Sequence, residues 1–370
     1  MPLKLLHVAD VHLDAPFGWL GRKGPDQRRQ LTATFRSAVD LAIRESVDAV
    51  LIAGDLFDSN SPTQASVDLV RAELRRLDRP TFILPGTHDC LDSGSIYRRV
   101  AFDEIPQVRV FDAERAVFEV APLGLAVHAR ANEAKTSEAS PLRGLAPLPT
   151  ARYNVALAHG SLAMPGTADD YPLSAAEIAA SGFDYVALGH WHRCQNCSAG
   201  RTVAWYSGPL EMLKIGDVGS ALGVEIAGRG AGDVRITRHD LGQTKHRQLS
   251  VEVDATTTTE TLRAAIAAHR DPALVLAVRL VGLRPLGLHL DTDALVAELR
   301  DDFRLLRIDD DSHPALSPAD LAAFPERTVL GEYVRRLSER IDASADDAER
   351  RRAEAALQLG VSLLLGREVL

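Results

Sequence analysis

The segment most informative about the fold is Leu5-Leu6-His7-Val8-Ala9-Asp10-Val11-His12, in which an apolar run ends at an aspartate and a histidine. A short run of this kind predicts a buried β-strand, because strands covered on both faces are apolar throughout. Asp10 and His12 are then expected on the loop that follows the strand.

Four more apolar runs along the chain are followed by polar motifs of the same kind. The predicted strands are Ala49–Ala53, Thr81–Leu84, Val155–Ala158 and Tyr185–Leu188. The motifs after them are Gly54-Asp55-Leu56-Phe57-Asp58, Gly86-Thr87-His88-Asp89, His159 and Gly189-His190-Trp191-His192. Side chains on loops at one edge of a sheet can converge although they are distant in sequence. Five motifs in this order make an accident of composition a poor explanation.

The residue types in these motifs predict a site for two divalent cations. Mixed carboxylate and imidazole ligands suit Mn²⁺, Fe²⁺ or Zn²⁺ better than Ca²⁺ or Mg²⁺, which prefer all-oxygen cages. Two cations roughly 3.5–4 Å apart can hold a phosphate, orient an attacking water and lower its pKa. Asp55 is the natural bridge, because one carboxylate can give an oxygen to each metal. A histidine that ligates no metal could act as a general acid.

The motifs resemble those of the calcineurin-like metallophosphoesterases, and most closely the DNA-repair exonucleases of the SbcD and YhaO type. Leu13-Asp14-Ala15-Pro16, Thr34-Phe35-Arg36 and the terminal Ala356–Val369 segment add to the similarity. The resemblance implies a four-layer α/β sandwich, in which two β-sheets are flanked by helices. It also implies a smaller α/β cap domain and C-terminal helices.

The resemblance further implies a role for each motif residue. One metal would be held by Asp10, His12, Asp55 and His192. The second would be held by Asp55, Thr87, His159 and His190. His88 matches the family's catalytic acid, Asp89 matches its orienting carboxylate, and Asp58 supports the site from outside the ligands. The expected cofactors are two divalent metal ions, with Mn²⁺ as the leading choice.

Thr87 departs from the family pattern, which has asparagine at this position. A threonine hydroxyl is a weaker and shorter ligand than an amide carbonyl. Three outcomes are open: Thr87 ligates directly, a water fills the gap, or the second metal binds weakly. The rest of the motif is intact, so we expect an active site with a looser second metal.

The charge of the chain does not by itself suggest a nucleic-acid enzyme. The formal net charge is −9, with 51 acidic and 42 basic residues among 370, whereas phosphate backbones are bound through Lys and Arg. Arg71, Arg75 and Arg79 recur at helical spacing and could line one helix face. An ordinary solvated helix surface is the simpler interpretation.

Other features predict a soluble cytoplasmic protein. The chain has no apolar run of transmembrane length, and its start lacks the regions of a signal peptide. Three cysteines do not make a disulfide framework. Cys194 and Cys197 form a Cys-x-x-Cys pair, and Cys90 follows Asp89, but none has the context of a zinc or redox site. We expect them to be small residues in turns.

The pattern of elements predicts three regions. Residues 1–245 would form the metallophosphoesterase domain, with helices at Gln27–Glu45, Gln64–Leu77 and Leu173–Ser181. Residues 246–315 read as a βαβαβ unit that resembles a capping domain in position, and residues 316–370 read as helices. By resemblance, these helices would meet an SbcC-like ABC-type ATPase, but packing against their own domain explains them equally well.

The leading prediction is a metal-dependent DNA phosphodiesterase, an exonuclease with some endonuclease activity. Its partners would be DNA and an ATPase, with a homodimer suggested by the family and no membrane. A phosphoesterase of nucleotides or other small phosphoesters is the first alternative, because the same site supports that reaction. The second is a weakly active scaffold for the ATPase, although such a protein would have no chemical need for His88 and Asp89.

Overall fold

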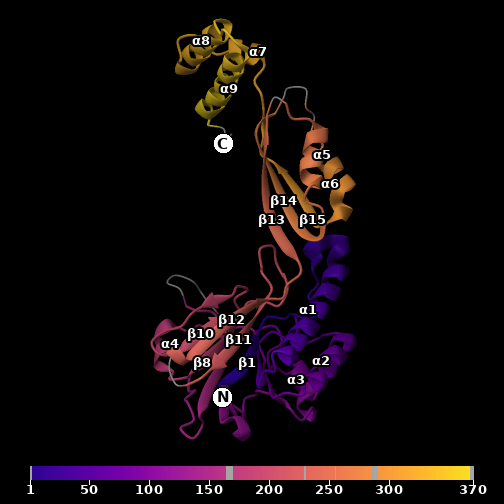
Figure 1. The fold of residues 1–370 in the computed structure, drawn as a ribbon, viewed down its shortest axis with the longest axis vertical. Helices are drawn as coiled ribbons and strands as arrows, with labels where there is room; N and C mark the ends of the chain where they lie inside the picture. Colours follow the sequence, from indigo (N-terminus) through magenta and orange to yellow (C-terminus); the bar gives the residue numbers. More distant parts are fainter. Residues whose placement is uncertain are drawn as a thin grey trace. The chain divides into compact units, whose positions relative to one another are not determined.

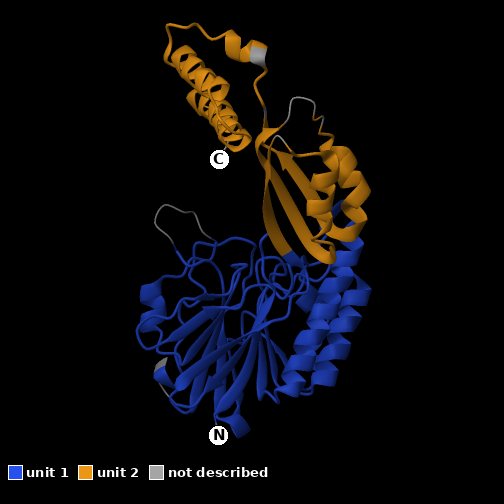
Figure 2. Cartoon of the chain, turned by 45° about the horizontal axis from the view of Figure 1, so that its top comes forward, with its two compact units in different colours: residues 1–245 blue, residues 246–370 orange. Residues whose placement is uncertain are grey.

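The structure, a computed structural model, describes residues 2–163, 170–228, 231–254, 256–284, 288 and 290–366. The chain divides into two compact units, residues 1–245 and residues 246–370 (Figure 2). The first unit contains all five polar motifs.

The first unit contains two mixed six-stranded sheets (Figure 1). The first sheet has the order β12-β11-β1-β2-β3-β4. Its strands are β1 (Leu3–Val8), β2 (Ala49–Ala53), β3 (Thr81–Leu84), β4 (Val108–Val110), β11 (Ser220–Ile226) and β12 (Val234–Asp240). β1 to β4 are parallel to one another, whereas β11 and β12 pair in antiparallel fashion. The motifs after β1, β2 and β3 therefore lie at the same edge.

The second sheet has the order β5-β6-β7-β8-β10-β9. Its strands are β5 (Val117–Val120), β6 (Leu125–Ala129), β7 (Tyr153–His159), β8 (Tyr185–Gly189), β9 (Gln195–Asn196) and β10 (Val203–Tyr206). β6, β7, β8 and β10 are parallel. His159 and the Gly-His-Trp-His motif thus end neighbouring parallel strands.

The main core lies between the two sheets, because alternate residues of each strand point to opposite faces. Leu5 of β1 and Ala187 of β8 belong to this shared core, whereas their neighbours Leu6 and Val186 face outward. Helices α1 (Gly24–Arg44) and α2 (Gln64–Leu77) cover the outer face of the first sheet. Helix α4 (Ala175–Ala180) covers that of the second. This arrangement confirms the predicted four-layer sandwich.

Local sequence signals explain where the helices begin. The side chain of Thr63 accepts a hydrogen bond from Ser66 N–H at the start of α2, as expected of an N-cap threonine. Ser174 and Glu177 form a reciprocal capping box at the start of α4. The short helix α3 (Ile96–Arg99) and the 3-10 turns Gly18–Lys23, Phe102–Glu104, Ala121–Leu123 and Ala231–Asp233 also lie in the described connections of this unit.

The second unit contains a separate sheet and a helical end. The sheet is built from β13 (Lys245–Val253), β14 (Asp271–Arg284), β15 (Phe303–Asp310) and β16 (His313–Pro314), with α5 (Thr259–Ala267) and α6 (Thr292–Leu299) between its strands. The helical end comprises α7 (Pro318–Ala322), α8 (Val329–Asp342) and α9 (Asp347–Leu364). Tyr333 of α8 donates a hydrogen bond to the carbonyl oxygen of Ala356 in α9. Residues 367–369 of the terminal segment that resembles the family lie outside the described residues.

None of the helices in the described ranges is long and apolar enough to cross a bilayer. Most predicted strands and helices of the first unit are present within a few residues of their expected bounds. The strands β4, β5 and β9 carry no clear sequence signal, because they are two to four residues long and lack a sustained apolar run.

Candidate metal centre

The five polar motifs meet at one edge of the sandwich. Asp10 and His12 follow β1, Asp55 follows β2, and Thr87 and His88 follow β3 in the first sheet. His159 ends β7, and His190 and His192 follow β8 in the second sheet. β2 lies against both β7 and β8 across the core. The loops of the two sheets therefore converge, as the strand pattern predicts.

The backbone at these loops adopts conformations that non-glycine residues rarely take. Asp10, His12 and Asp55 have φ values of 51°, 50° and 52°, and His190 has a φ of 104°. Positive φ costs free energy in residues with a Cβ, and it persists where the surrounding structure enforces it. Four such residues at converging strand ends indicate that the fold holds these side chains in place for a function.

Two motif glycines let the strands approach closely enough to assemble the cluster. A Cβ on Gly54, whose φ is 95°, would overlap with the imidazole of His159. A Cβ on Gly189 would overlap with the carbonyl oxygen of Ala53 in the neighbouring sheet. The glycines that precede Asp55 and His190 are therefore required for the site to assemble, because any side chain at these positions would overlap with the facing strand.

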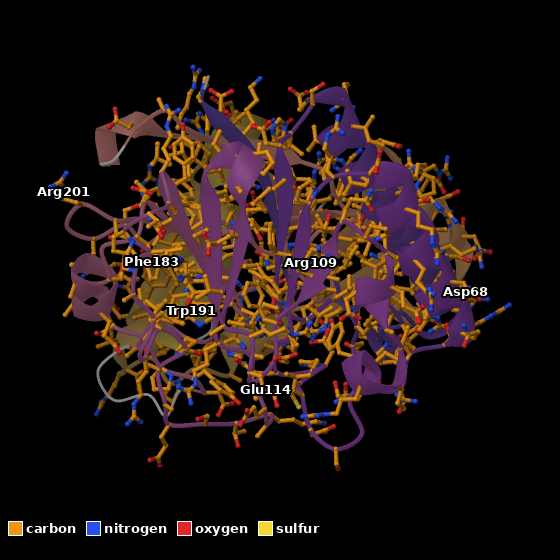
Figure 3. The ribbon with its side chains drawn as sticks, turned by 90° about the horizontal axis from the view of Figure 1, so that it is seen from below. Asp68, Arg109, Glu114, Phe183, Trp191 and Arg201 are labelled. Atoms are coloured by element: carbon orange, nitrogen blue, oxygen red, sulfur yellow. The ribbon has the colours of Figure 1, made fainter. Side chains whose placement is uncertain are left out.

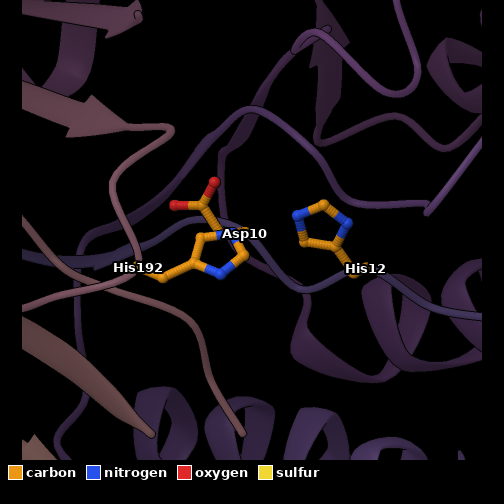
Figure 4. A group of neighbouring side chains, drawn as sticks. All are labelled: Asp10, His12 and His192. Atoms are coloured by element: carbon orange, nitrogen blue, oxygen red, sulfur yellow. The ribbon is translucent and has the colours of Figure 1, made fainter. Parts of the chain in front are cut away.

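Asp10, His12 and His192 form the first of three groups whose ligand atoms lie within 4.8 Å of one another (Figure 4). The backbone N–H of His190 donates to both carboxylate oxygens of Asp10, at 2.9 and 3.1 Å. His12 Nδ1 lies 3.0 Å from Asp58 Oδ1. His12 Nε2 is buried without a hydrogen-bond partner and lies 3.5 Å from Asp55 Oδ2. A buried nitrogen left bare beside carboxylates fits a metal ligand.

The second group contains Asp10, Asp55 and His159. Asp55 Oδ2 lies 3.2 Å from His159 Nε2. Thr87 Oγ1 donates to Asp55 Oδ2 at 3.3 Å and lies 3.4 Å from His159 Nε2. The rings of His159 and His190 are 5.3 Å apart. The hydroxyl of Thr87 thus lies beside the Asp55 carboxylate, and the ring of His190 lies beside that of His159.

The ionisable groups of the cluster shift one another's pKa values. Burial alone would raise the pKa of Asp55, but the charge and hydrogen bond of His159, together with the charges of His12 and His88, outweigh it and lower that pKa. Burial disfavours a charged His159, yet the Asp55 carboxylate raises its pKa to about 9. Burial, together with the charge on His159, lowers the pKa of His190 to about 4. A proton on His159 therefore occupies the place that a cation beside Asp55 would take.

We expect the metal-free chain to lose stability as pH rises from 6.5 through about 9. The pKa of His159 is about 9 in the folded chain against 6.5 when unperturbed, so its proton stabilises the fold fully below pH 6.5 and the effect is lost as pH rises through 9. Urea unfolding in EDTA at pH 6 and pH 9.5 measures this loss, with His159→Gln as the matched variant. The same pH dependence in His159→Gln would contradict the assignment.

His88 faces the cluster but is half-exposed. Its ring lies 4.5 Å from the ring of His12, and its Nδ1 lies 2.9 Å from the backbone oxygen of Asp58. His88 also forms the third group of ligand-competent atoms, with His12 and Asp55. The side chain can therefore serve either as a proton donor or as a metal ligand, and the two roles predict different behaviour.

Asp89 lies away from His88, in contrast to the orienting role expected from the family pattern. Its buried carboxylate accepts hydrogen bonds from Gly86 N–H, Phe57 N–H and the Tyr97 hydroxyl, at 2.8, 3.1 and 2.6 Å. No contact of Asp89 with the His88 ring is found among the described residues, and Asp58 occupies that place. Asp89 instead fastens the loops after β2 and β3 to each other, because one carboxylate can accept from several donors.

Asp217 is a residue of the site that the motifs do not reveal. Its Oδ2 lies 3.3 Å from His192 Nδ1 and accepts a 2.9 Å hydrogen bond from the backbone N–H of Lys214. The arrangement matches the carboxylate–histidine pairs that orient metal ligands in proteins. No sequence signal identifies Asp217, because it lies 25 residues after His192 on a loop without a recognisable pattern.

Other histidines and the cysteines lie outside the cluster. His7 is buried and bonds through Nδ1 to the Tyr185 hydroxyl, and His128 bonds to Asn154. Both are core histidines. Cys194 packs in the core between the sheets and Cys197 in the core under α4, on opposite faces of the second sheet. Burial raises the pKa of both thiols, which makes them poor nucleophiles.

The cluster opens into a cavity of about 740 Å³. Its wall includes Phe17, Trp19, Trp191, Arg193 and Lys214. The volume falls in the range of pockets that bind organic ligands, and it exceeds what a lone phosphate requires. Room therefore exists beside the cluster for a group attached to the phosphate.

Comparison with known proteins identifies relatives of the first unit. A family model described as calcineurin-like phosphoesterase matches residues 3–194. The chain is 29% identical over 229 residues to the uncharacterized metallophosphoesterase YhaO of Bacillus subtilis, covering 59% of this chain and 55% of that protein.

Two further relatives carry names that refer to nucleic acids or nucleases. One is the DNA double-strand break repair protein Mre11 of Saccharolobus solfataricus, 26% identical over 51% of this chain and 49% of that protein. The other is the SbcD component of the nuclease SbcCD of Bacillus subtilis, 27% identical over 60% of this chain and 66% of that protein. The chain spans about half to two thirds of the length of the curated relatives it matches.

Proposed function

The chain belongs to the calcineurin-like phosphoesterase family, and on that basis we propose that it is a metal-dependent phosphodiesterase that cleaves DNA. The observation that carries the proposal is the convergence of three ligand-competent groups on Asp55 and Asp10 beside a cavity. The similarity to a protein named for double-strand break repair and to one named as part of a nuclease supports DNA as the substrate.

The donor set fits two cations. Asp10, His12 and His192 would hold one, Asp55 would be shared, and Thr87, His159 and His190 would surround the other. Divalent cations there would neutralise phosphate charge and supply an activated water near neutral pH. Nitrogen and oxygen donors in this mixture favour Mn²⁺ over Ca²⁺ or Mg²⁺.

His88 would protonate the leaving oxygen of the substrate. Its Nδ1 donates to the Asp58 carbonyl oxygen, which leaves Nε2 to carry the transferred proton. Its half-exposed ring lines the cavity, so it can reach a bound ester. Asp89 would be a positioning residue, because it holds together the two loops that carry Asp55 and His88.

A second candidate function is hydrolysis of a small phosphoester. It is favoured by the acidic net charge of −9 and by the pairing of the arginines on α2. Arg71 pairs with Glu104, and Arg76 pairs with Asp40 and Glu73. Arg79 lies beyond the end of α2, so the three arginines do not line one helix face, which agrees with the simpler interpretation of a solvated surface. This helix therefore offers little unpaired positive charge to a long polyanion.

A comparison of cleavage rates on different substrates distinguishes the two candidate functions. The chain is incubated with labelled single- and double-stranded DNA, with nucleotides and with phosphopeptides, in Mn²⁺, in Mg²⁺ and without metal. Cleavage of DNA that depends on Mn²⁺ and exceeds that of the small esters supports the nuclease. Faster hydrolysis of nucleotides or phosphopeptides than of DNA would replace it with the second candidate.

We also propose roles for the three regions of the chain. Residues 1–245 would form the catalytic domain, residues 246–315 a capping domain, and residues 316–370 a surface for an ABC-type ATPase. Val329, Leu363 and Leu364 are exposed apolar side chains on α8 and α9, which supports a protein partner there. Co-purification of the full chain with the ATPase, compared with a chain that ends at residue 315, tests the last role. Light scattering of the full chain gives its oligomeric state.

We expect Asp217→Ala to lower the affinity for one metal about tenfold, at the lower end of what removal of a ligand's outer partner costs. The carboxylate 3.3 Å from His192 Nδ1 would hold that ring with Nε2 toward the metal. Calorimetric titration with Mn²⁺ measures the change, and Asp217→Asn, which can still accept a hydrogen bond, should lose less. Equal affinities in the wild type and Asp217→Ala would refute this role.

A further inference from the structure

The cavity beside the metal cluster is lined by two cationic side chains, Arg193 and Lys214, among its described residues. No carboxylate of the described residues lies within ion-pair distance of either. Many arginines of the first unit are paired, such as Arg115 with Asp112 and Asp103. In a chain of net charge −9, an unpaired cation in a cavity is available for an anionic ligand.

Arg193 is held in place by a stack of aromatic rings. Its guanidinium lies 4.7 Å from the centre of the Trp191 ring, which can be located in Figure 3. Trp191 in turn stacks on Tyr206 at 5.2 Å with an interplanar angle of 17°. The Tyr206 hydroxyl donates to the Gly160 carbonyl oxygen at 2.7 Å. A guanidinium that lies over an aromatic face keeps its N–H donors, which point outward in its own plane, free for a phosphate.

Lys214 is held through its backbone, while its side chain is exposed. Asp217 accepts hydrogen bonds from the N–H groups of Leu213 and Lys214, at 3.3 and 2.9 Å. The Trp19 indole N–H donates to the Leu213 carbonyl oxygen at 3.0 Å. Two bonds to Asp217 thus close the loop that carries Lys214, and the Trp19 bond ties this loop to a distant segment of the cavity wall. Its ammonium group keeps its donors for a ligand.

We propose that Arg193 and Lys214 form a second anion subsite, which binds a phosphate that flanks the phosphate being cleaved. Phe17, Trp19 and Leu213 give the same cavity an apolar wall, which suits the nucleoside between two phosphates. The substrate class is therefore a nucleic-acid strand with at least two successive phosphates. The inference rests on the proposed phosphodiesterase function and adds a preference that the metal cluster alone does not supply.

The experiment compares thymidine dinucleotides that differ by one terminal phosphate: TpT, pTpT and TpTp. We expect one of the two added phosphates to raise kcat/KM of the wild type about tenfold. The double variant Arg193→Ala/Lys214→Ala should lose most of that gain. The double variant Lys135→Ala/Arg143→Ala is the matched control, because it removes the same charge from exposed positions outside the cavity. This control should keep the gain.

A binding measurement separates this inference from the proposed function. The dissociation constant of thymidine 3′,5′-bisphosphate is compared with that of thymidine 5′-monophosphate, in Mn²⁺, from tryptophan fluorescence. We expect the wild type and the control to prefer the bisphosphate, and the Arg193→Ala/Lys214→Ala variant to lose the preference. An equal preference in all three proteins would overturn the subsite. Retained preference without cleavage of any dinucleotide would instead refute the phosphodiesterase and leave the subsite standing.

Discussion

His88→Ala is expected to lower kcat for DNA cleavage about 10²–10⁴-fold, the usual contribution of a positioned general acid. The leaving oxygen of a nucleotide is a poor leaving group without a proton, and His88 lines the cavity beside the cluster. Metal binding should be retained, because the ligands proposed for both cations remain. Single-turnover cleavage and Mn²⁺ content, measured on the same preparation, check both parts.

A substrate that needs no proton provides the matched control for this prediction. The p-nitrophenolate of bis(p-nitrophenyl) phosphate leaves readily as an anion, so His88→Ala should cleave it with a much smaller loss than DNA. His88 also lies within ligand distance of His12 and Asp55. Loss of metal together with an equal loss on both substrates would make His88 a ligand and remove it as the acid.

Thr87→Asn is expected to raise the affinity for the second cation about tenfold, or about 1.4 kcal/mol. An amide oxygen reaches further than a hydroxyl and is a stronger ligand. The Thr87 hydroxyl lies 3.3 Å from Asp55 Oδ2 and 3.4 Å from His159 Nε2, so the longer side chain would enter the space between them. Titration with Mn²⁺, followed by electron paramagnetic resonance, counts the weaker and tighter sites separately.

Thr87→Val separates the roles left open for the native hydroxyl. Valine has a similar shape but cannot ligate or hold a water. If the hydroxyl or a water bound to it contributes, Thr87→Val should weaken the second cation below its wild-type affinity. An unchanged affinity in both Thr87→Val and Thr87→Asn would show that position 87 takes no part in metal binding.

Much of the first unit could be predicted from the sequence, because its strands are buried on both faces. Ala49–Ala53 and Thr81–Leu84 are entirely apolar apart from one threonine, and their predicted and observed bounds coincide. Each is followed by glycine and polar residues that cannot continue a buried strand. Strand β5 was missed because Val117–Val120 is only partly buried, so its pattern gives no such contrast.

The sequence predicted which residues belong to the candidate site better than it predicted which of their side chains contact one another. The family pattern implied that Asp89 orients His88. In the structure, the Asp89 carboxylate instead accepts hydrogen bonds from Gly86, Phe57 and Tyr97. Residues adjacent in sequence on a turn often point to opposite sides, so adjacency does not imply contact. Asp217 and His192 meet for the opposite reason, since a loop after β10 returns to the end of β8.

The order of residues was enough to predict the buried strands that carry the site, the polar motifs that follow them, and the family to which the chain belongs. These properties depend on local apolar runs and on residue types at fixed spacing. Packing in three dimensions sets the partners of each side chain: Asp217 beside His192, Asp58 beside His88, and the stack of Tyr206, Trp191 and Arg193. Such contacts join residues from different loops, and their distances are set by how the two sheets pack.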